Sequence, residues 1–155
     1  MAIEIEKKFL LNYLPFSLMT DKEYIEQGYI VREKNKSVRV RLYGNKGFIT
    51  IKSDLKGILR REYEYIVPKE DAKEMLLFVC EKPLIQKNRY KVLFNGLEWT
   101  IDEFKKENKG LLLAEIELNS SDQKFELPDW IGKEVSHDPK YYNVNLIRNP
   151  YSKWY

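Results

Sequence analysis

Alternation of apolar and ionised residues recurs along this chain and limits its fold more than any other feature. A period of two places successive side chains on opposite faces of a β-strand. The alternation runs through seven segments: 3–6, 38–42, 48–52, 60–66, 85–93, 97–104 and 112–118. Segment 23–34 is also expected to be extended, because its Tyr, Ile and Val residues suit strands. About eight strands are therefore predicted.

Turn residues separate these segments and favour antiparallel hairpins. Segment 44–47, Gly-Asn-Lys-Gly, is typical of a hairpin loop, and Asn95-Gly96 is a strong signal for a two-residue hairpin. We therefore predict one mainly β (α+β) domain over residues 1–155. It would be an antiparallel β-barrel of about eight strands, either closed or open and C-shaped, with two or three flanking helices.

Helices are expected at few places. Pro68 is followed by acids in the next turn, which predicts a helix running to about Cys80. Asp138-Pro139 has the form of a helix start, and the helix would end before the next proline. A short helix is expected around 121–126, and segment 20–23 has the form of a capping box that could begin a helical turn.

The polar face of the strands is almost entirely ionised, where Ser, Thr, Asn and Gln would be usual. One parity per strand collects seven acids and seven bases: Glu4, Glu6, Lys8, Arg39, Arg41, Lys52, Arg60, Glu62, Glu64, Lys87, Arg89, Asp102, Glu115 and Glu117. A solvated outer face is one interpretation. The other is a barrel lumen, where so many charges would need partners. Lys and Arg would hold a polyanion there, and carboxylates would hold divalent cations.

Composition excludes several other classes of protein. One Cys and one His exclude an internal disulfide and argue against zinc sites and Ser-His-Asp chemistry. With 27 Lys and Arg against 24 Asp and Glu, the chain is not a strongly basic nucleic-acid binder. No apolar run approaches the ~20 residues of a membrane helix. The amino end lacks the pattern of a signal peptide, so the cytoplasm is the expected compartment.

The opening residues Glu4–Phe9 contain a Glu-x-Glu-x-Lys motif that resembles the signature of the CYTH superfamily, the triphosphate tunnel metalloenzymes. Segments similar to the successive family motifs follow in the right order: Gln27–Tyr29, Val38–Arg41, Thr50–Ser53, Arg60–Glu64, Lys87–Tyr90, Trp99–Phe104, Ala114–Leu118 and Gly132–Val135. The resemblance covers essentially the whole chain and points to the small single-domain bacterial triphosphatases. It implies a barrel whose tunnel binds a triphosphate with one or two Mg²⁺ or Mn²⁺ ions.

The resemblance also implies roles for the charged residues. The expected metal-binding acids are Glu4, Glu6, Asp102, Glu115 and Glu117. The expected substrate-binding bases are Lys8, Arg39, Arg41, Lys52, Arg60, Lys87 and Arg89. The expected catalytic residues are Glu6, Tyr29, Glu62, Glu64 and Lys87. Oxygen-only ligands suit Mg²⁺ or Mn²⁺.

The leading prediction is a metal-dependent hydrolase that cleaves inorganic tripolyphosphate to pyrophosphate and phosphate. The sequence leaves other functions open: hydrolysis of nucleoside or thiamine triphosphate, class IV adenylate cyclase activity, and a polyphosphate-binding module without turnover. The expected partner is a small-molecule triphosphate, with no membrane or nucleic acid. A homodimer is an open alternative, because the aromatic segment 151–155 would pack against the barrel, pack against a second subunit or be a disordered end.

Overall fold

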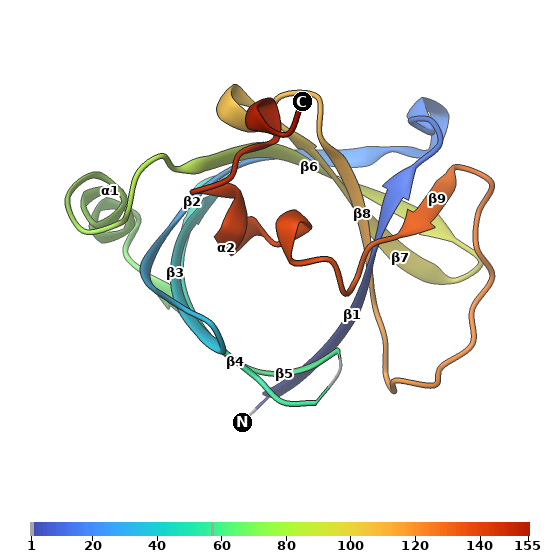
Figure 1. Ribbon diagram of the computed structural model, residues 1–155, viewed down its shortest axis with the longest axis horizontal. Coiled ribbons are helices and arrows are strands. Elements are labelled where there is room, and N and C mark those ends of the chain that lie inside the picture. The colour runs from blue at the N-terminus through green and yellow to red at the C-terminus, as the bar shows by residue number, and fades with distance from the viewer. Residues whose placement is uncertain (1, 57) are drawn as a thin grey trace.

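The alternating segments all form strands. The protein is described by a computed structural model over residues 2–56 and 58–155, and it forms an antiparallel β-barrel (Figure 1). The strands are β1 Ala2–Leu11, β2 Thr20–Glu33, β3 Lys36–Tyr43, β4 Lys46–Asp54, β5 Leu59–Val67, β6 Ile85–Phe94, β7 Leu97–Phe104, β8 Leu112–Glu117 and β9 Ile131–Glu134. The mainly β prediction is confirmed.

The barrel is closed. Its strand order is β5-β4-β3-β2-β6-β7-β8-β1, and β5 pairs with β1 to complete the ring. In that pair Glu4 lies opposite Arg60 and Ile3 lies opposite Arg61. The short strand β9 pairs with the C-terminal part of β1, where Phe9 lies opposite Glu134. The open, C-shaped alternative is therefore excluded.

The predicted hairpins are present, and their backbone angles explain why these residues form them. Asn95 and Gly96 join β6 to β7, and both have positive φ angles, of 48° and 75°. Two successive positive φ values give the turn whose twist matches that of antiparallel strands. Gly44 and Asn45 likewise join β3 to β4, and Gly44 has a φ of 58°.

The helices follow the sequence predictions less closely. Helix α1 (Lys69–Phe78) forms as expected and packs outside β3 and β4. The helix expected after Asp138 is broken into a 3₁₀ turn at Pro139–Tyr141 and the short α2 (Asn143–Leu146). The Asp138 carboxylate accepts a hydrogen bond from the amide N–H of Lys140, at 3.2 Å, which caps only the first of these turns.

Two helical predictions are wrong. Segment 20–23 is the start of β2, where Thr20 pairs with Lys91, so strand pairing overrides the local capping pattern. Segment 121–126 has no helix. Its Phe125 ring instead packs edge-on against Trp99, with 5.8 Å between ring centroids, which holds the segment as a loop over the barrel wall.

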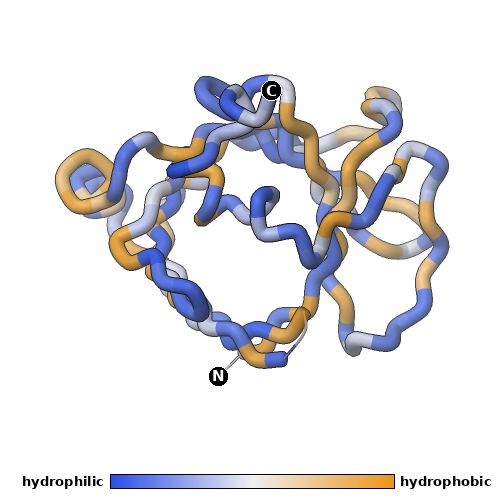
Figure 2. The backbone as a smooth tube through the Cα atoms, viewed as in Figure 1, coloured by the Kyte–Doolittle hydropathy of each residue, from blue (hydrophilic) through white to orange (hydrophobic). Residues whose placement is uncertain are grey.

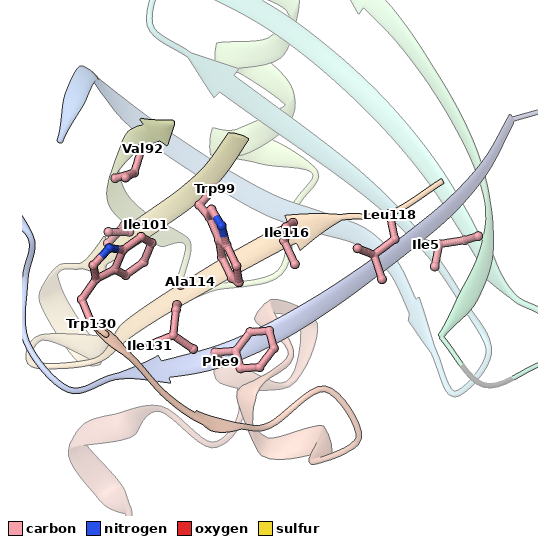
Figure 3. Close-up of a cluster of buried hydrophobic side chains, with 10 residues drawn as sticks. All are labelled: Ile5, Phe9, Val92, Trp99, Ile101, Ala114, Ile116, Leu118, Trp130 and Ile131. Atoms are coloured by element: carbon pink, nitrogen blue, oxygen red, sulfur yellow. The ribbon is translucent and has the colours of Figure 1, made fainter. Parts of the chain in front are cut away.

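Two of the three hydrophobic clusters lie outside the ring of strands. The largest cluster gathers on the outward faces of β1, β6, β7 and β8 under β9 and the 119–130 loop (Figure 3): Ile5, Phe9, Val92, Trp99, Ile101, Ala114, Ile116, Leu118, Trp130 and Ile131. A smaller cluster beneath α1 contains Val40, Ala72, Leu76 and Cys80. Hydrophilic and hydrophobic residues alternate around the ring (Figure 2), so the ionised parity is left facing inward.

The C-terminal part of the chain turns back across the barrel. Segment 136–148 lies within the ring of strands (Figure 1). Tyr141, Leu146 and Ile147 are buried against Ile85 and Leu113 and fix this segment in place. No helix in the described part of the chain is long and apolar enough to cross a membrane.

Candidate active site in the barrel lumen

The ionised faces of the strands surround a cavity of about 960 Å³. Every predicted site residue lines it except Asp102: Glu4, Glu6, Lys8, Tyr29, Arg39, Arg41, Lys52, Arg60, Glu62, Glu64, Lys87, Arg89, Glu115 and Glu117. The ionised parity therefore lines a cavity within the barrel, and the interpretation as a solvated outer face is excluded.

One wall of the cavity is acidic and is formed by β1 and β8. Glu6 lies directly opposite Glu117 in the strand register. Side chains at such positions have Cβ atoms about 5 Å apart, and like charges there repel. Burial raises the pKa of Glu117, and the charges of Glu4 and Glu6 raise it further. Lys52 offsets part of this charge, because its Nζ lies 2.9 Å from Glu4 Oε2.

The acidic wall fits a divalent cation. Its donors are carboxylate oxygens, the ligands that Mg²⁺ and Mn²⁺ prefer. Glu4 and Glu6 both act on Glu117 electrostatically, which shows that these carboxylates lie near one another at the wall. In residues 2–56 and 58–155 no three acidic, His or Cys side chains gather closely enough to enclose an ion on their own. That arrangement suits Mg²⁺, which is usually held by one or two carboxylates together with substrate phosphates and water.

The facing wall is basic and is formed mainly by β3 and β6. Burial, together with the neighbouring charges of Arg39 and Arg89, lowers the pKa of Arg41 to about 9. Arg39 Nε is buried, with no hydrogen-bond partner among the described residues. Buried guanidinium groups without full compensation favour binding of an anion.

Asp102 is placed differently from the prediction. Its side chain is 1% exposed and lies beneath Lys87 and Arg89. Asp102 Oδ2 is 2.7 Å from Lys87 Nζ, and Asp102 Oδ1 is 2.7 Å from Arg89 Nε. Burial would raise the pKa of Asp102, but Arg89 and Lys87 hold it well below its usual range. Both oxygens already bind cations, so the predicted metal-ligand role does not fit this arrangement.

Lys87 is a strongly perturbed base at the cavity. Burial lowers the pKa of its ammonium to about 7, although the charge of Asp102 opposes the change. The same carboxylate has the stronger effect on Arg89, and it raises the pKa of that guanidinium in spite of burial. The Asp102 carboxylate therefore fixes two neighbouring cations that differ in how readily they release a proton.

The other predicted catalytic residues lie on neighbouring strands. Tyr29 is buried and pairs with Arg39 across β2 and β3. Glu64 accepts a hydrogen bond from Thr50 Oγ1 at 2.8 Å, and its Oε1 lies 3.6 Å from Arg39 Nη2. Glu62 lies opposite Lys52 in the register of β4 and β5.

Sequence reasoning missed the residues that the C-terminal segment contributes. Asn143 Oδ1 accepts a hydrogen bond of 3.0 Å from Lys87 Nζ. The centroid of the Tyr142 ring lies 5.7 Å from Lys8 Nζ and 5.5 Å from Arg60 Cζ, within range of cation–π attraction. These residues are on no strand, so the alternating pattern carried no signal for them.

Gln27 was also missed as a site residue. Its side chain is fully buried, and its Oε1 accepts a hydrogen bond from Arg41 Nε at 3.2 Å. It belongs to one of the family-like motifs, but it is uncharged, so a search restricted to ionised residues passed over it. The signal that could have found it is its place on β2, two positions from Tyr29.

Comparison with known proteins places this fold in a family. The family model of the CYTH domain matches residues 2–151. An inorganic triphosphatase from Acetivibrio thermocellus is 48% identical over 154 residues, covering 99% of each chain. An inorganic triphosphatase from Nitrosomonas europaea is 34% identical over 147 residues, covering 92% of this chain and 95% of the other.

Solved structures agree with the sequence relatives. The crystal structure of an inorganic triphosphatase superposes with a TM-score of 0.68 at 32% identity, covering 95% of each chain. A protein from Pyrococcus horikoshii superposes with a TM-score of 0.59 at 23% identity, covering 77% of this chain and 80% of the other. The second similarity shows a shared fold only.

Proposed function

This chain belongs to the CYTH domain family, and from that premise we propose that it is a metal-dependent hydrolase that cleaves inorganic tripolyphosphate to pyrophosphate and phosphate. The observation that carries the proposal is the cavity itself, in which an acidic wall faces a basic wall inside a closed barrel. Two relatives named inorganic triphosphatase, matched over nearly the full chain, support the same substrate.

The basic residues would hold the substrate. Phosphoryl transfer depends mainly on positioning the phosphates and stabilising charge on their oxygens, with little covalent help from the protein. The bases proposed to bind phosphate oxygens are Lys8, Arg39, Arg41, Lys52, Arg60, Lys87 and Arg89, all of which line the cavity. Several guanidinium groups allow paired hydrogen bonds to one phosphate.

The acidic residues would hold Mg²⁺ or Mn²⁺. The proposed ligands come from Glu4, Glu6, Glu115 and Glu117, on the β1 and β8 side of the cavity, where one or two of these carboxylates would bind the ion together with substrate phosphates and water. Such an ion, when bound, supplies Lewis-acid polarisation of phosphate oxygens. Asp102 is assigned instead to positioning Lys87 and Arg89, because both of its oxygens already bind these cations.

The chain's own residues would carry out the proton and water chemistry. We assign Glu62 and Glu64 to orient the attacking water, whose oxygen bonds to the terminal phosphorus and whose proton passes to a carboxylate. The bond from that phosphorus to the bridging oxygen breaks, and its electron pair leaves with pyrophosphate. Lys87 would donate a hydrogen bond to the departing oxygen. Tyr29, opposite Arg39, would orient a phosphate group or the water.

The cavity lining favours an inorganic substrate over an organic one. Among the described residues that line it, the apolar or aromatic side chains are Tyr29, Pro139, Tyr142 and Val144. Sites for organic groups are lined mainly by apolar and aromatic side chains. The Tyr142 ring, moreover, already lies beside Lys8 and Arg60. A nucleobase or thiamine ring would therefore find little apolar surface.

Product release from several triphosphates tests the proposal. Tripolyphosphate, ATP and thiamine triphosphate are each incubated with Mg²⁺, Mn²⁺ or EDTA. Glu6→Gln should lower turnover on the order of 100-fold or more. Mutation of a residue that only hydrogen-bonds to a metal ligand already costs about 10- to 100-fold in metal affinity or activity. Glu107→Gln, at an exposed position, is the matched control and should leave turnover unchanged.

The products distinguish the competing functions. Metal-dependent phosphate release, fastest with tripolyphosphate and lost in Glu6→Gln, is the expected result. Faster release from ATP or thiamine triphosphate would replace the inorganic substrate with an organic one. Cyclic AMP and pyrophosphate from ATP would identify a cyclase. No product, together with tight triphosphate binding in EDTA, would identify a binding module.

A further inference from the structure

The Lys87 ammonium is held between two side chains from different parts of the chain. Asp102 on β7 accepts a hydrogen bond from Lys87 Nζ at 2.7 Å, and Asn143 on α2 accepts another at 3.0 Å. We propose that Asn143 is a positioning residue for hydrolysis, which directs the third N–H of Lys87 at the substrate and couples Lys87 to Arg41 through Gln27. This inference rests on the proposed function and adds a residue outside the charged barrel wall to the site.

The orientation of the Asn143 amide is fixed by its neighbours. Lys87 can only donate, and Gln27 Nε2 also donates to Asn143 Oδ1, at 3.4 Å. The Gln27 amide is fixed in turn, because its Oε1 accepts from Arg41 Nε, and a guanidinium can only donate. Two amides therefore link the ammonium of Lys87 to the guanidinium of Arg41 in one defined direction.

The same contacts determine where Lys87 can point. An ammonium has three N–H donors, and Asp102 and Asn143 take two of them. The side chain is 1% exposed yet lines the cavity, so the remaining donor is the one available to a bound phosphate. Without Asn143, the ammonium is free to rotate about its contact with Asp102.

Asn143 itself is held rigidly, as a positioning residue must be. Leu146 and Ile147, three and four residues further on, are buried in a cluster with Ile85 and Phe104. The hydroxyl of Tyr142 donates to the carbonyl oxygen of Ser136 at 3.0 Å. The segment therefore presents the Asn143 oxygen to Lys87 from a fixed support.

A merely structural role is the competing explanation, in which Asn143 only keeps α2 inside the barrel. The two roles differ in what they do to turnover. Loss of a structural contact lowers the free energy of unfolding and leaves kcat of the folded enzyme near its original value. Loss of a positioning contact lowers kcat with little change in KM, because alignment of the reacting groups is lost while substrate binding remains.

The test compares steady-state tripolyphosphate hydrolysis by the wild type, Asn143→Ala, Asn143→Asp and Asn149→Ala. We expect Asn143→Ala to lower kcat on the order of 10- to 100-fold with KM changed less than about threefold. Asn143→Asp keeps an oxygen acceptor in place. It should keep kcat within about threefold of the wild type while raising KM, because the added charge repels the substrate. Asn149, which is exposed and follows directly after segment 136–148, supplies the matched Asn-to-Ala control.

Thermal unfolding and tripolyphosphate binding in EDTA accompany the kinetics. A folded Asn143→Ala variant with wild-type kcat overturns the inference. If Asn143→Ala does not fold, Asn143→Leu replaces it, because Leu is close to Asn in size but offers no acceptor to Lys87. A folded Asn143→Leu variant whose kcat is lowered 10-fold or more, with KM within about threefold of the wild type, supports the inference, and a wild-type kcat overturns it. If the wild type itself releases no phosphate from any triphosphate, the proposed function fails and this inference fails with it. That result is recognisable before any variant is compared.

Discussion

Replacing Asp102 with Asn tests the role of this carboxylate directly. The Asp102 side chain is 1% exposed, and its two oxygens make three short hydrogen bonds to Lys87 and Arg89, at 2.7, 2.7 and 2.9 Å. Asn has almost the same shape but no charge. The substitution therefore leaves two buried cations side by side with their common counter-charge removed.

The expected cost follows from this geometry. Removing one partner of a buried ion pair costs about 3–5 kcal/mol, because the remaining charge stays buried without compensation. For a domain of this length each kcal/mol lowers the melting temperature by about 2–4 °C. We therefore expect Asp102→Asn to lower the melting temperature by roughly 6–20 °C.

The assay is thermal and urea unfolding in EDTA, so that no divalent cation contributes. Glu103→Gln is the matched control on the same strand. Glu103 is half-exposed and lies 3.3 Å from Lys105 Nζ, and such a surface pair contributes less than about 1 kcal/mol. If Asp102 only ligated a metal, Asp102→Asn would unfold like the wild type in EDTA. A change smaller than that of Glu103→Gln would refute the positioning role.

Three further predictions follow from buried or crowded positions. A Cβ at Gly28 would lie 2.7 Å from Leu84 Cδ2 and 2.8 Å from Cys80 Cβ. Gly28→Ala should therefore lower the free energy of unfolding in urea by about 1–3 kcal/mol. An unchanged urea midpoint would contradict this prediction. Burial raises the pKa of the Cys80 thiol. Cys80 should therefore react with a disulfide reagent at pH 8 only after denaturant is added. Rapid reaction in the native protein would contradict its burial in the core. Burial and nearby acids raise the pKa of Glu117, so its charge destabilises the fold at pH 8. Glu117→Gln should therefore raise the melting temperature in EDTA and reduce the stabilisation that Mg²⁺ provides. A lower melting temperature of this variant in EDTA would contradict the repulsion.

The strands and their inward faces could be predicted because they depend on local alternation. Val38–Leu42 and Leu112–Glu117 show the pattern plainly, and the structure places both in the barrel. Closure of the ring could not be predicted, since it depends on pairing of β1 with β5, more than fifty residues apart. Local signals also failed at Thr20–Glu23, where pairing with β6 outweighs a capping pattern.

The cavity residues that could be predicted all lie on strands, and all but Tyr29 are charged. Asp102 has the inward parity, but parity does not reveal depth, and Lys87 and Arg89 cover it from β6. Asn143 and Tyr142 lie on a segment that reaches the cavity by crossing the barrel, and no periodic pattern marks that path. Sequence therefore predicts the charged lining of the lumen, and the tertiary fold determines which groups position that lining.

A crystal structure with Mn²⁺ and a slowly hydrolysed imido analogue of tripolyphosphate tests the central claim most directly. We predict anomalous density from Mn²⁺ beside Glu6 and Glu117, and the three phosphorus atoms within the barrel against Arg41 and Lys87. Asp102 should remain bound to Lys87 and Arg89, with no metal contact. An analogue bound outside the barrel, or a metal ion held away from the β1 and β8 wall, would contradict the account.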